Sequence, residues 1–517
     1  MPHVALVAFT GIRVREREML ELGMTLPGFR DRAAALARLP ALGLLTLAGM
    51  TPPHWTCSYH DTDRIIGACA RESSDNASAE QSPESSATTH AGDDDDRPDE
   101  ALLVEVLAQR PSLVAVSALT ASVLDAYRFA QGIRAAGVPT VLGGLHATAC
   151  PDEALRRFDA VVIGDGESVW GELLYDVENR ALKPKYHGTT FDLSRSPQPR
   201  LELLAGAPAP RYTVQTQRGC PFACEFCAAS RLLGPFREKP IECIERELDA
   251  IGAIQPEPVI ELADDNTFAG RRHPRLLFEA LARRRVRYFT ECDWRVGERP
   301  ELLKSLAASG CEQLLIGVES LVHAPPGMGA KRASLQRISD AIVAIQEAGV
   351  VVNACFIAGC DGETRASLDR LAAFILDAPF AEVQITLQTP FPGAPLRRRL
   401  QREGRLLPDR GWPHYTLFDL TFQPDRMSVA ELESAYRHLL REVYGPVATA
   451  RRSELRREIL RKRRAAEATN TAQSVSPERR RFDRRCQLTE SRGSTNSRAA
   501  DDDCAGFGHC GDDLSTS

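Results

Sequence analysis

Short apolar runs and longer amphipathic stretches alternate along most of the chain. In the N-terminal third, the later runs are bounded by Gly or Pro, which is typical of strands buried in a parallel sheet. Alternating strands and helices predict an α/β fold, here an N-terminal doubly wound, Rossmann-like domain over residues 1–180. The predicted strands are Val4–Phe9, Trp55–Tyr59, Leu113–Ser117, Pro139–Leu142 and Ala160–Ile163, and the predicted helices include Ser122–Ala136 and Ser168–Val177.

A second series of six apolar runs begins after about residue 206. Six strands with helices between them predict a partial (β/α)6 barrel over residues 206–405, an open relative of the eight-stranded barrel. Such barrels place their chemistry at the carboxyl ends of the strands, so these loops are searched first for functional residues. The predicted strands are Tyr212–Gln217, Val259–Ala263, Arg287–Glu291, Gln313–Ile316, Val351–Ile357 and Glu382–Gln388.

Four segments lack this alternation. Residues 71–100 are rich in Ser, Ala, Asp and Glu and include the acidic run Asp93–Asp96, which predicts a disordered insertion. Residues 181–205 have the prolines of a linker, and residues 406–447 predict a small helical appendage. Residues 448–517 are first basic and then polar, which predicts a frayed helix followed by a disordered tail.

Composition narrows the setting in which the protein works. The chain has 517 residues and a formal net charge of −6, which gives no general argument for nucleic-acid binding. No stretch reaches the roughly 18 apolar residues of a membrane span. The run Val4–Phe9 has no basic leader and is too short for a signal peptide. Together with 14 scattered cysteines, these features predict a reducing cytoplasm.

Three closely spaced cysteines, Cys220, Cys224 and Cys227, follow the first predicted barrel strand, with gaps of three and then two residues. Three thiolates so close together can hold three corners of an iron–sulfur cube and leave the fourth iron open. A structural zinc site would need a further ligand pair, which the sequence does not offer, and a disulfide framework does not suit so long a chain. The spacing, with Phe226 before the last cysteine, resembles the signature of the radical SAM superfamily.

This resemblance implies that the three cysteines ligate a [4Fe–4S] cluster and that S-adenosylmethionine (SAM) chelates its open iron. Reductive cleavage of SAM then gives a 5′-deoxyadenosyl radical. Two alternatives remain open: Phe226 can also be a core side chain, and Asp264 can form an Asx turn before the next helix. No catalytic residue is assigned. The SAM-binding residues that the resemblance implies are Phe226, Asp264, Gly317, Glu319 and Ser320.

Two later stretches also carry chemistry-bearing residues. The fifth barrel strand ends in a segment with Cys360, which resembles the stretch that packs on adenine in the superfamily. Cys360 can be a catalytic thiol or a small buried core residue. The stretches Thr389–Pro395 and Glu403–Arg405 resemble those of cobalamin-linked members of the superfamily. The first, with two prolines and a glycine, can be a substrate wall or simply a turn.

The N-terminal domain has hydroxyls, glycines and an acid in three loops at the carboxyl ends of its predicted strands, where open sheets bind ligands. Ahead of a radical SAM barrel, such loops resemble the cobalamin-binding domain of a large subgroup. The first loop, Thr10–Arg15, lacks the cobalt-ligating histidine of many such domains, and His146 lies in a different loop. Cobalt then has no protein imidazole, or the domain no longer binds cobalamin. The implied cobalamin residues are Ser117, Thr120, Gly143, Gly144, Gly164, Gly166 and Glu167.

These resemblances imply an enzyme that uses a [4Fe–4S] cluster, SAM and cobalamin to take hydrogen from an unactivated carbon. The predicted outcome is C-methylation of a lipid, a tetrapyrrole or another natural product. An oxidative cyclase or rearrangement enzyme, a tRNA methylthiotransferase suggested by the basic tail, and a non-enzymatic sensor are the alternatives. The expected partners are a small-molecule or lipid substrate and a reductant such as flavodoxin or ferredoxin, with no nucleic acid.

Overall fold

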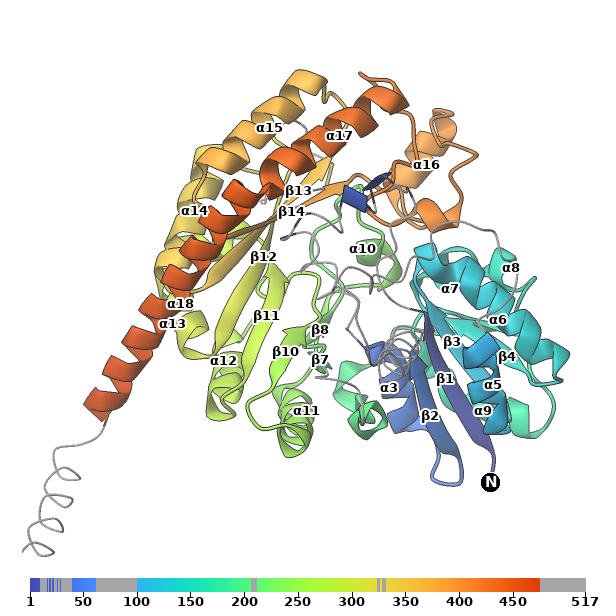
Figure 1. Ribbon diagram of the computed structural model, residues 1–517. Coiled ribbons are helices and arrows are strands. Elements are labelled where there is room, and N and C mark those ends of the chain that lie inside the picture. Colours follow the sequence, from blue (N-terminus) through green and yellow to red (C-terminus); the bar gives the residue numbers. More distant parts are fainter. Residues whose placement is uncertain are drawn as a thin grey trace, which may run out of the picture. The chain divides into compact units, whose positions relative to one another are not determined.

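Two parallel sheets of six strands organise the protein, as the computed structural model in Figure 1 shows. The loop Thr10–Arg15 and residues 71–99 of the predicted insertion lie outside the described residues, and Glu100 begins a helix. The structure describes residues 1–9, 40–61, 100–205, 212–322 and 332–474, with scattered positions between 16 and 28 and at 326–327.

The N-terminal sheet has the strand order β2-β1-β3-β4-β5-β6, and all its neighbouring strands are parallel. This order confirms the predicted doubly wound domain. The strands are β1 (His3–Phe9), β2 (Thr56–Asp61), β3 (Leu113–Ala118), β4 (Thr140–Gly143), β5 (Ala160–Ile163) and β6 (Lys185–His187). The helices are α3 (Leu42–Met50), α5 (Glu100–Ala108), α6 (Val123–Ala135), α7 (Leu145–Ala149), α8 (Pro151–Ala154) and α9 (Trp170–Glu178).

Alternate side chains of this sheet enter two different cores. In β1, Val4 and Leu6 are buried in the core that α3 and α9 cover, whereas Ala5 and Val7 are buried in the core that α5 and α6 cover. Successive residues of a strand point to opposite faces, so a sheet buried on both sides reads as a continuous apolar run. This is why the short apolar runs in the sequence predicted these strands.

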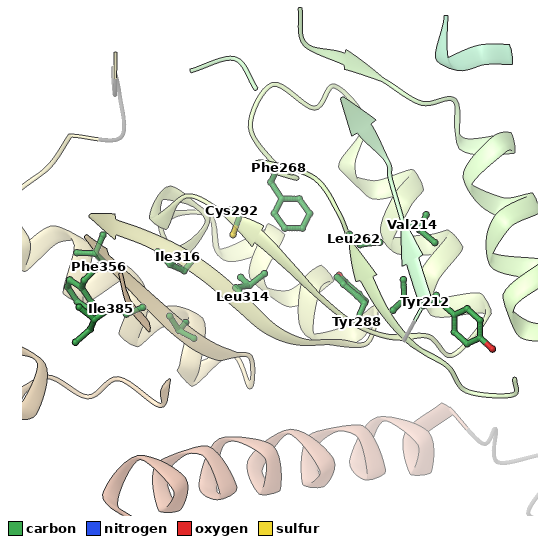
Figure 2. Close-up of a cluster of buried hydrophobic side chains, with 14 of the residues drawn as sticks. Tyr212, Val214, Leu262, Phe268, Tyr288, Cys292, Leu314, Ile316, Phe356 and Ile385 are labelled. Carbon is green, nitrogen blue, oxygen red and sulfur yellow. The ribbon is translucent and has the colours of Figure 1, made fainter. Parts of the chain in front are cut away.

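The second sheet has the order β14-β13-β12-β11-β10-β7, and its neighbouring strands are also parallel. Its six strands with helices between them confirm the predicted partial barrel. Figure 2 shows buried side chains from its successive strands, which lie side by side across the sheet. The strands are β7 (Tyr212–Val214), β10 (Val259–Leu262), β11 (Arg287–Cys292), β12 (Cys311–Glu319), β13 (Val351–Ala358) and β14 (Glu382–Leu387). The helices are α11 (Ile241–Ile254), α12 (Pro274–Arg283), α13 (Pro300–Ala308), α14 (Leu335–Glu347), α15 (Arg365–Asp377), α16 (Pro395–Arg402) and α17 (Val429–Tyr444).

Two segments differ from the sequence-based expectation. Within the predicted linker 181–205, β6 pairs with β5 and becomes an edge strand of the N-terminal sheet. Helix α18 (Pro446–Ser474) occupies the first part of the predicted tail 448–517, where Ile459 is buried against Val351. A frayed helix was predicted at the start of this segment, but its packing was not, because the abundant arginines mask the apolar side chains of Leu455 and Ile459. Residues 475–517 lie outside the described residues.

Within the described residues, no helix combines the length and the apolar character needed to cross a membrane.

Candidate functional site

The three clustered cysteines lie on one loop at the carboxyl end of β7, reached through the short strand β8 (Gln217–Arg218). Cys224 is buried, whereas Cys220 and Cys227 are half-buried. The backbone N–H of Ser230 donates to Cys227 Sγ at 3.4 Å. Gly219 begins the loop with φ +77°, and a Cβ there would approach Gly234 O to 2.9 Å. The loop therefore needs glycine at this position to make its turn.

The arrangement of the cysteines bears on which metal could bind. Among the described residues, no group of three His, Cys, Asp or Glu side chains converges as the ligands of one metal ion. A zinc ion would need thiolates within about 2.3 Å of a common centre. In a [4Fe–4S] cluster each thiolate binds its own iron, so the sulfurs need not converge. The loop is thus compatible with the predicted cluster.

Glu225 lies inside the cysteine loop and pairs with an arginine of α16, near the C-terminal end of the barrel domain. Arg399 of α16 donates to both Glu225 carboxylate oxygens, at 2.8 and 3.2 Å, and also contacts Asp361 at 2.7 Å. Arg405, from the predicted Glu403–Arg405 stretch, contacts the other oxygen of Asp361 at 2.7 Å. The hydrogen bond with Glu225 raises the pKa of Arg399, so the guanidinium stays charged. Arg399 therefore fixes the cysteine loop, and Arg405 supports it through the shared partner Asp361.

Asp264 is fully enclosed at the end of β10. Its carboxylate accepts hydrogen bonds from the backbone N–H groups of Thr216 and Gln217, at 2.8 and 3.0 Å, and from the hydroxyl of Thr267 at 3.1 Å. Burial raises its pKa. Asp264 thus braces two strand ends, and its contact with SAM, which the resemblance implies, stays a prediction.

Asp265, the next residue, was not singled out in the sequence analysis. It is half-buried beside Asp264, and burial together with the Asp264 charge raises its pKa to about 6. A nearby ammonium group would offset both effects, because an opposite charge favours the ionised carboxylate. The Asp-Asp pair in the sequence gives no sign of which member is enclosed, since that depends on how β7 and β10 pair.

Glu319 ends β12 in an unusual conformation. The register with β13 shifts between Gly317 and Glu319, and Glu319 has φ +71°. A non-glycine residue in this region is strained and persists where the surrounding structure enforces it, often at a functional site. The hydroxyl of Ser320 donates to Glu363 at 2.6 Å, and Glu363 also accepts from the backbone N–H of Gly359 at 2.7 Å. Of the predicted residues here, Ser320 is therefore engaged by the protein itself.

Cys360 and Phe226 both have the surroundings of core side chains. Cys360 is buried, and burial raises the pKa of its thiol well above the usual value, so the reactive thiolate is disfavoured. This is the environment of a core cysteine and not of a catalytic one. Phe226 is half-buried and packs against the barrel core, and its contact with SAM stays a prediction.

A pocket of about 290 Å³, here called the strand-end pocket, lies at the carboxyl ends of the N-terminal strands. Its other walls come from α3 and from the start of the barrel, where Gln215, Arg218 and Ala263 line it. Six of the seven predicted cobalamin residues line the pocket and Thr120 does not: Ser117, Gly143, Gly144, Gly164, Gly166 and Glu167.

The glycines of the strand-end pocket keep it open. A Cβ on Gly143 would meet only the Val162 side chain, at 3.9 Å, so any side chain there would occupy the pocket. Gly144 has φ +97°, and a Cβ on it would lie 3.3 Å from the Ser117 hydroxyl. A narrow cradle that side chains would fill suits the tail of a bound corrinoid, so these residues fit cobalamin.

Glu167 connects the two sheets. Arg218, two residues before Cys220, contacts Glu167 at 2.6 Å and Asp165 at 3.2 Å. Arg237 contacts Asp165 at 2.5 Å. Glu167 was predicted as a direct cobalamin contact; it lines the strand-end pocket, and its carboxylate pairs with the Arg218 guanidinium from β8, beside the cysteine loop. Ion pairs thus join the loop of one predicted cofactor site to the loop of the other.

His146 faces away from the strand-end pocket. Its Nδ1 lies 3.2 Å from the Thr120 hydroxyl, and its ring packs edge-on against Trp412 with 5.2 Å between centroids. Burial lowers the pKa of His146 to about 4, so the ring is neutral at pH 7. His146 and Thr120 contact one another inside the domain and do not line the pocket.

Family models match three parts of the chain. "Radical SAM superfamily" matches residues 214–403, "B12 binding domain" matches residues 88–174, and "Domain of unknown function (DUF4070)" matches residues 394–489. The first match covers the cysteine loop and the barrel, and the second covers the loops that line the strand-end pocket.

Two known proteins are similar to this chain over more than half of its length. Bacteriochlorophyllide d C-12(1)-methyltransferase of Chlorobaculum tepidum is 26% identical over 354 residues, which are 66% of this chain and 76% of that protein. Hopanoid C-2 methylase of Rhodopseudomonas palustris is 29% identical over 286 residues, 53% of this chain and 54% of that protein.

Solved structures share the fold. The radical SAM methyltransferase TsrM of Kitasatospora setae, solved with cobalamin and a [4Fe–4S] cluster, has a TM-score of 0.57 at 16% identity and covers 90% of this chain and 100% of its own. The cobalamin-dependent enzyme OxsB has a TM-score of 0.59 at 14% identity and covers 84% of this chain and 66% of its own. These structures show the fold. The two family models, over residues 88–174 and 214–403, identify the chain as an enzyme of the radical SAM superfamily, in the subgroup with a B12-binding domain, whose cofactors are a [4Fe–4S] cluster, SAM and cobalamin.

Proposed function

We propose that this enzyme transfers a methyl group to an unactivated carbon of a bulky, largely apolar small molecule, such as a lipid, a tetrapyrrole or another natural product. One observation carries the proposal: Arg218 lines the strand-end pocket and lies two residues before Cys220. Delivery of a radical and a methyl group to one substrate needs two cofactors that open toward the same space. The similar proteins that methylate bacteriochlorophyllide and hopanoids support this class of substrate.

Aromatic side chains after the sixth strand support an apolar substrate. Phe391 and Trp412 are half-buried, and their ring centroids lie 6.3 and 5.1 Å from that of Tyr415. Trp412 Nε1 donates to Glu153 of the N-terminal domain at 2.7 Å, which fixes the indole. The Arg397 guanidinium covers Trp412 and Tyr415, 4.7 and 5.3 Å from their ring centroids, so the half-buried Phe391 is the ring of this group that supports an apolar wall beside the Thr389–Pro395 loop.

When bound, the cluster with SAM supplies a radical that takes hydrogen from the substrate, and cobalamin supplies the methyl group. The residues of the chain bind and orient these groups. In this proposal the three cysteines hold the cluster, Glu319 and Asp265 hold SAM, and the glycine-lined pocket holds cobalamin. The cleavage of SAM is reductive, so we also propose a one-electron donor such as flavodoxin or ferredoxin.

The test uses anaerobically reconstituted protein with a one-electron reductant, SAM labelled with deuterium in its methyl group, and candidate hopanoid and tetrapyrrole substrates. We expect a product that has gained the labelled methyl group, together with 5′-deoxyadenosine. The triple variant Cys220→Ala, Cys224→Ala and Cys227→Ala is the control, and its iron should fall from about four atoms to none. A product that has lost hydrogen without gaining label would contradict methylation and support an oxidative cyclase.

Binding of SAM is tested separately, through Glu319. Removal of a charge-assisted hydrogen bond in Glu319→Gln should weaken SAM binding by roughly 1.5–3 kcal/mol. Glu312→Gln is the matched control, because Glu312 lies near the other end of β12, paired with Arg287 at the surface. Equal SAM affinity in the Glu319 variant and the wild type would remove Glu319 from the proposed site.

A further inference from the structure

A buried ion pair forms part of the barrel-side wall of the strand-end pocket. Lys239 precedes α11, and Glu247 lies in the middle of that helix. Lys239 Nζ donates to Glu247 Oε1 at 2.7 Å, and the two side chains are only 6% and 3% exposed. Both residues line the pocket, together with Ser117 and the glycines of the opposite wall.

The second carboxylate oxygen of Glu247 is unsatisfied. Oε2 is buried and has no hydrogen-bond partner within the described chain. Burial raises the pKa of Glu247, and the Lys239 charge acts against that effect. A buried acceptor without a donor is costly, so such groups in folded proteins usually have a partner from the protein, water or a ligand.

The fold alone does not explain why this pair is kept. Replacing a buried ion pair with apolar side chains of similar volume is often neutral or stabilising. Neither residue belongs to the ion pairs between Arg218 and the Asp165–Glu167 loop. The pair instead gives the pocket wall an ordered polar surface with one open acceptor, Glu247 Oε2.

The charge of the pair restricts what can bind to it. Lys239 and Glu247 together are neutral, and the open atom is a carboxylate oxygen. An anion such as a phosphodiester would be repelled by this oxygen, whereas a neutral N–H or O–H group would satisfy it. Cobalamin carries such groups in two places: primary amides around the corrin ring and a ribose hydroxyl in the nucleotide tail.

We propose that Lys239 and Glu247 form a polar subsite of the cobalamin pocket in which Glu247 Oε2 accepts a hydrogen bond from an amide or hydroxyl of the corrinoid. Lys239 holds the Glu247 carboxylate in place and is a positioning residue. The pocket volume of about 290 Å³ is too small for a whole corrinoid and suits a part of the size of the nucleotide tail. This inference rests on the binding of cobalamin by the N-terminal domain.

The experiment measures hydroxocobalamin affinity by absorbance titration of the reconstituted full-length protein. Loss of a charge-assisted hydrogen bond in Glu247→Gln should weaken binding roughly ten- to hundredfold. Glu245→Gln is the matched control, because Glu245 lies on the same helix, pairs with Arg283 and Arg284, and does not line the pocket. Its affinity should equal that of the wild type.

A second variant separates binding from folding. The double variant Lys239→Met with Glu247→Met fills the same volume with apolar atoms, so its thermal midpoint should match or exceed that of the wild type. Its hydroxocobalamin affinity should nevertheless fall as far as that of Glu247→Gln. A double variant that is stable and binds hydroxocobalamin as tightly as the wild type overturns the proposal.

Cobinamide, which lacks the nucleotide tail, identifies the donor. If the ribose hydroxyl is the donor, Glu247→Gln weakens hydroxocobalamin only, and if a corrin amide is the donor, it weakens both ligands. Either result supports the subsite. Unchanged affinity for both ligands overturns it while leaving cobalamin binding intact. A wild-type protein that binds neither ligand overturns cobalamin binding itself, and the subsite with it.

Discussion

The ion pair between Arg218 and Glu167 gives the sharpest prediction, because it ties the predicted cobalamin loop to the segment that leads into the cysteine loop. The two side chains are 13% and 10% exposed, and Nη2 of Arg218 lies 2.6 Å from Glu167 Oε1. The change to test is Arg218→Gln, which keeps most of the length of the side chain and removes its charge. Asp165 keeps its contact with Arg237 at 2.5 Å, so Glu167 is the carboxylate left without its partner.

The size of the effect follows from these contacts. Breaking a fully buried ion pair costs about 3–5 kcal/mol, because the remaining charge is left uncompensated. Here both groups keep some access to water, so about 2 kcal/mol is expected. If this cost falls on the cobalamin-binding conformation of the loop, hydroxocobalamin affinity falls roughly 30-fold, at 1.4 kcal/mol for each factor of ten. The iron content should not change, because the three cysteines are intact.

The assay is a double-mutant cycle on hydroxocobalamin affinity with Arg218→Gln, Glu167→Gln and the two together. Direct coupling predicts that the double variant loses about 1–2 kcal/mol less than the sum of the single losses. Additivity within about 0.5 kcal/mol would show that the pair does not link the two loops. A drop in iron content in Arg218→Gln alone would show that Arg218 acts on the cluster loop and not on the cobalamin loop.

Three further predictions concern other parts of the structure. Arg399→Gln should release Glu225 and speed the loss of iron during gel filtration. Arg398→Gln, which changes the exposed neighbouring residue, should not; equal iron loss in both variants would show that Arg399 does not hold the cysteine loop. Burial lowers the pKa of His146 from 6.5 to about 4, so between these pH values the unfolded chain binds a proton that the folded chain does not. The free energy of unfolding should therefore fall by up to about 3 kcal/mol as the pH drops from 6.5 to 4. His146→Gln should flatten that fall, and an unchanged pH profile would refute the assignment. Ile459→Ala should lower the free energy of unfolding in urea by about 2 kcal/mol if α18 is packed, and by almost nothing if it is not.

The strands were predictable because both sheets are parallel and covered on two faces. Val4–Phe9 and Val351–Ile357 are apolar at nearly every position, and such runs leave few alternatives to a buried strand. The same logic located the cysteine loop and the glycine loops, since in parallel sheets all strand ends of one kind lie at the same edge. Pattern therefore sufficed to find where the chemistry lies.

The identity of individual ligands was less predictable. Asp264 and Asp265 are adjacent and chemically alike, and only the pairing of β7 with β10 decides that Asp264 is enclosed. The engagement of Glu167 by Arg218 joins residues far apart in the sequence, so no local motif could announce it. Lys239 and Glu247 were missed for a different reason. An acid in an amphipathic helix normally predicts a solvent-exposed face, whereas Glu247 is buried.

Glu319 has a consequence for attempts to make this enzyme more robust. Its left-handed backbone costs a non-glycine residue about 1–2 kcal/mol, which glycine would recover. A library selected only for thermal tolerance should therefore favour Glu319→Gly, and the survivors would lack the carboxylate proposed to hold SAM. At position 319, selection for thermal stability and selection for activity are thus expected to favour different residues. Only a screen that measures both properties would retain the glutamate.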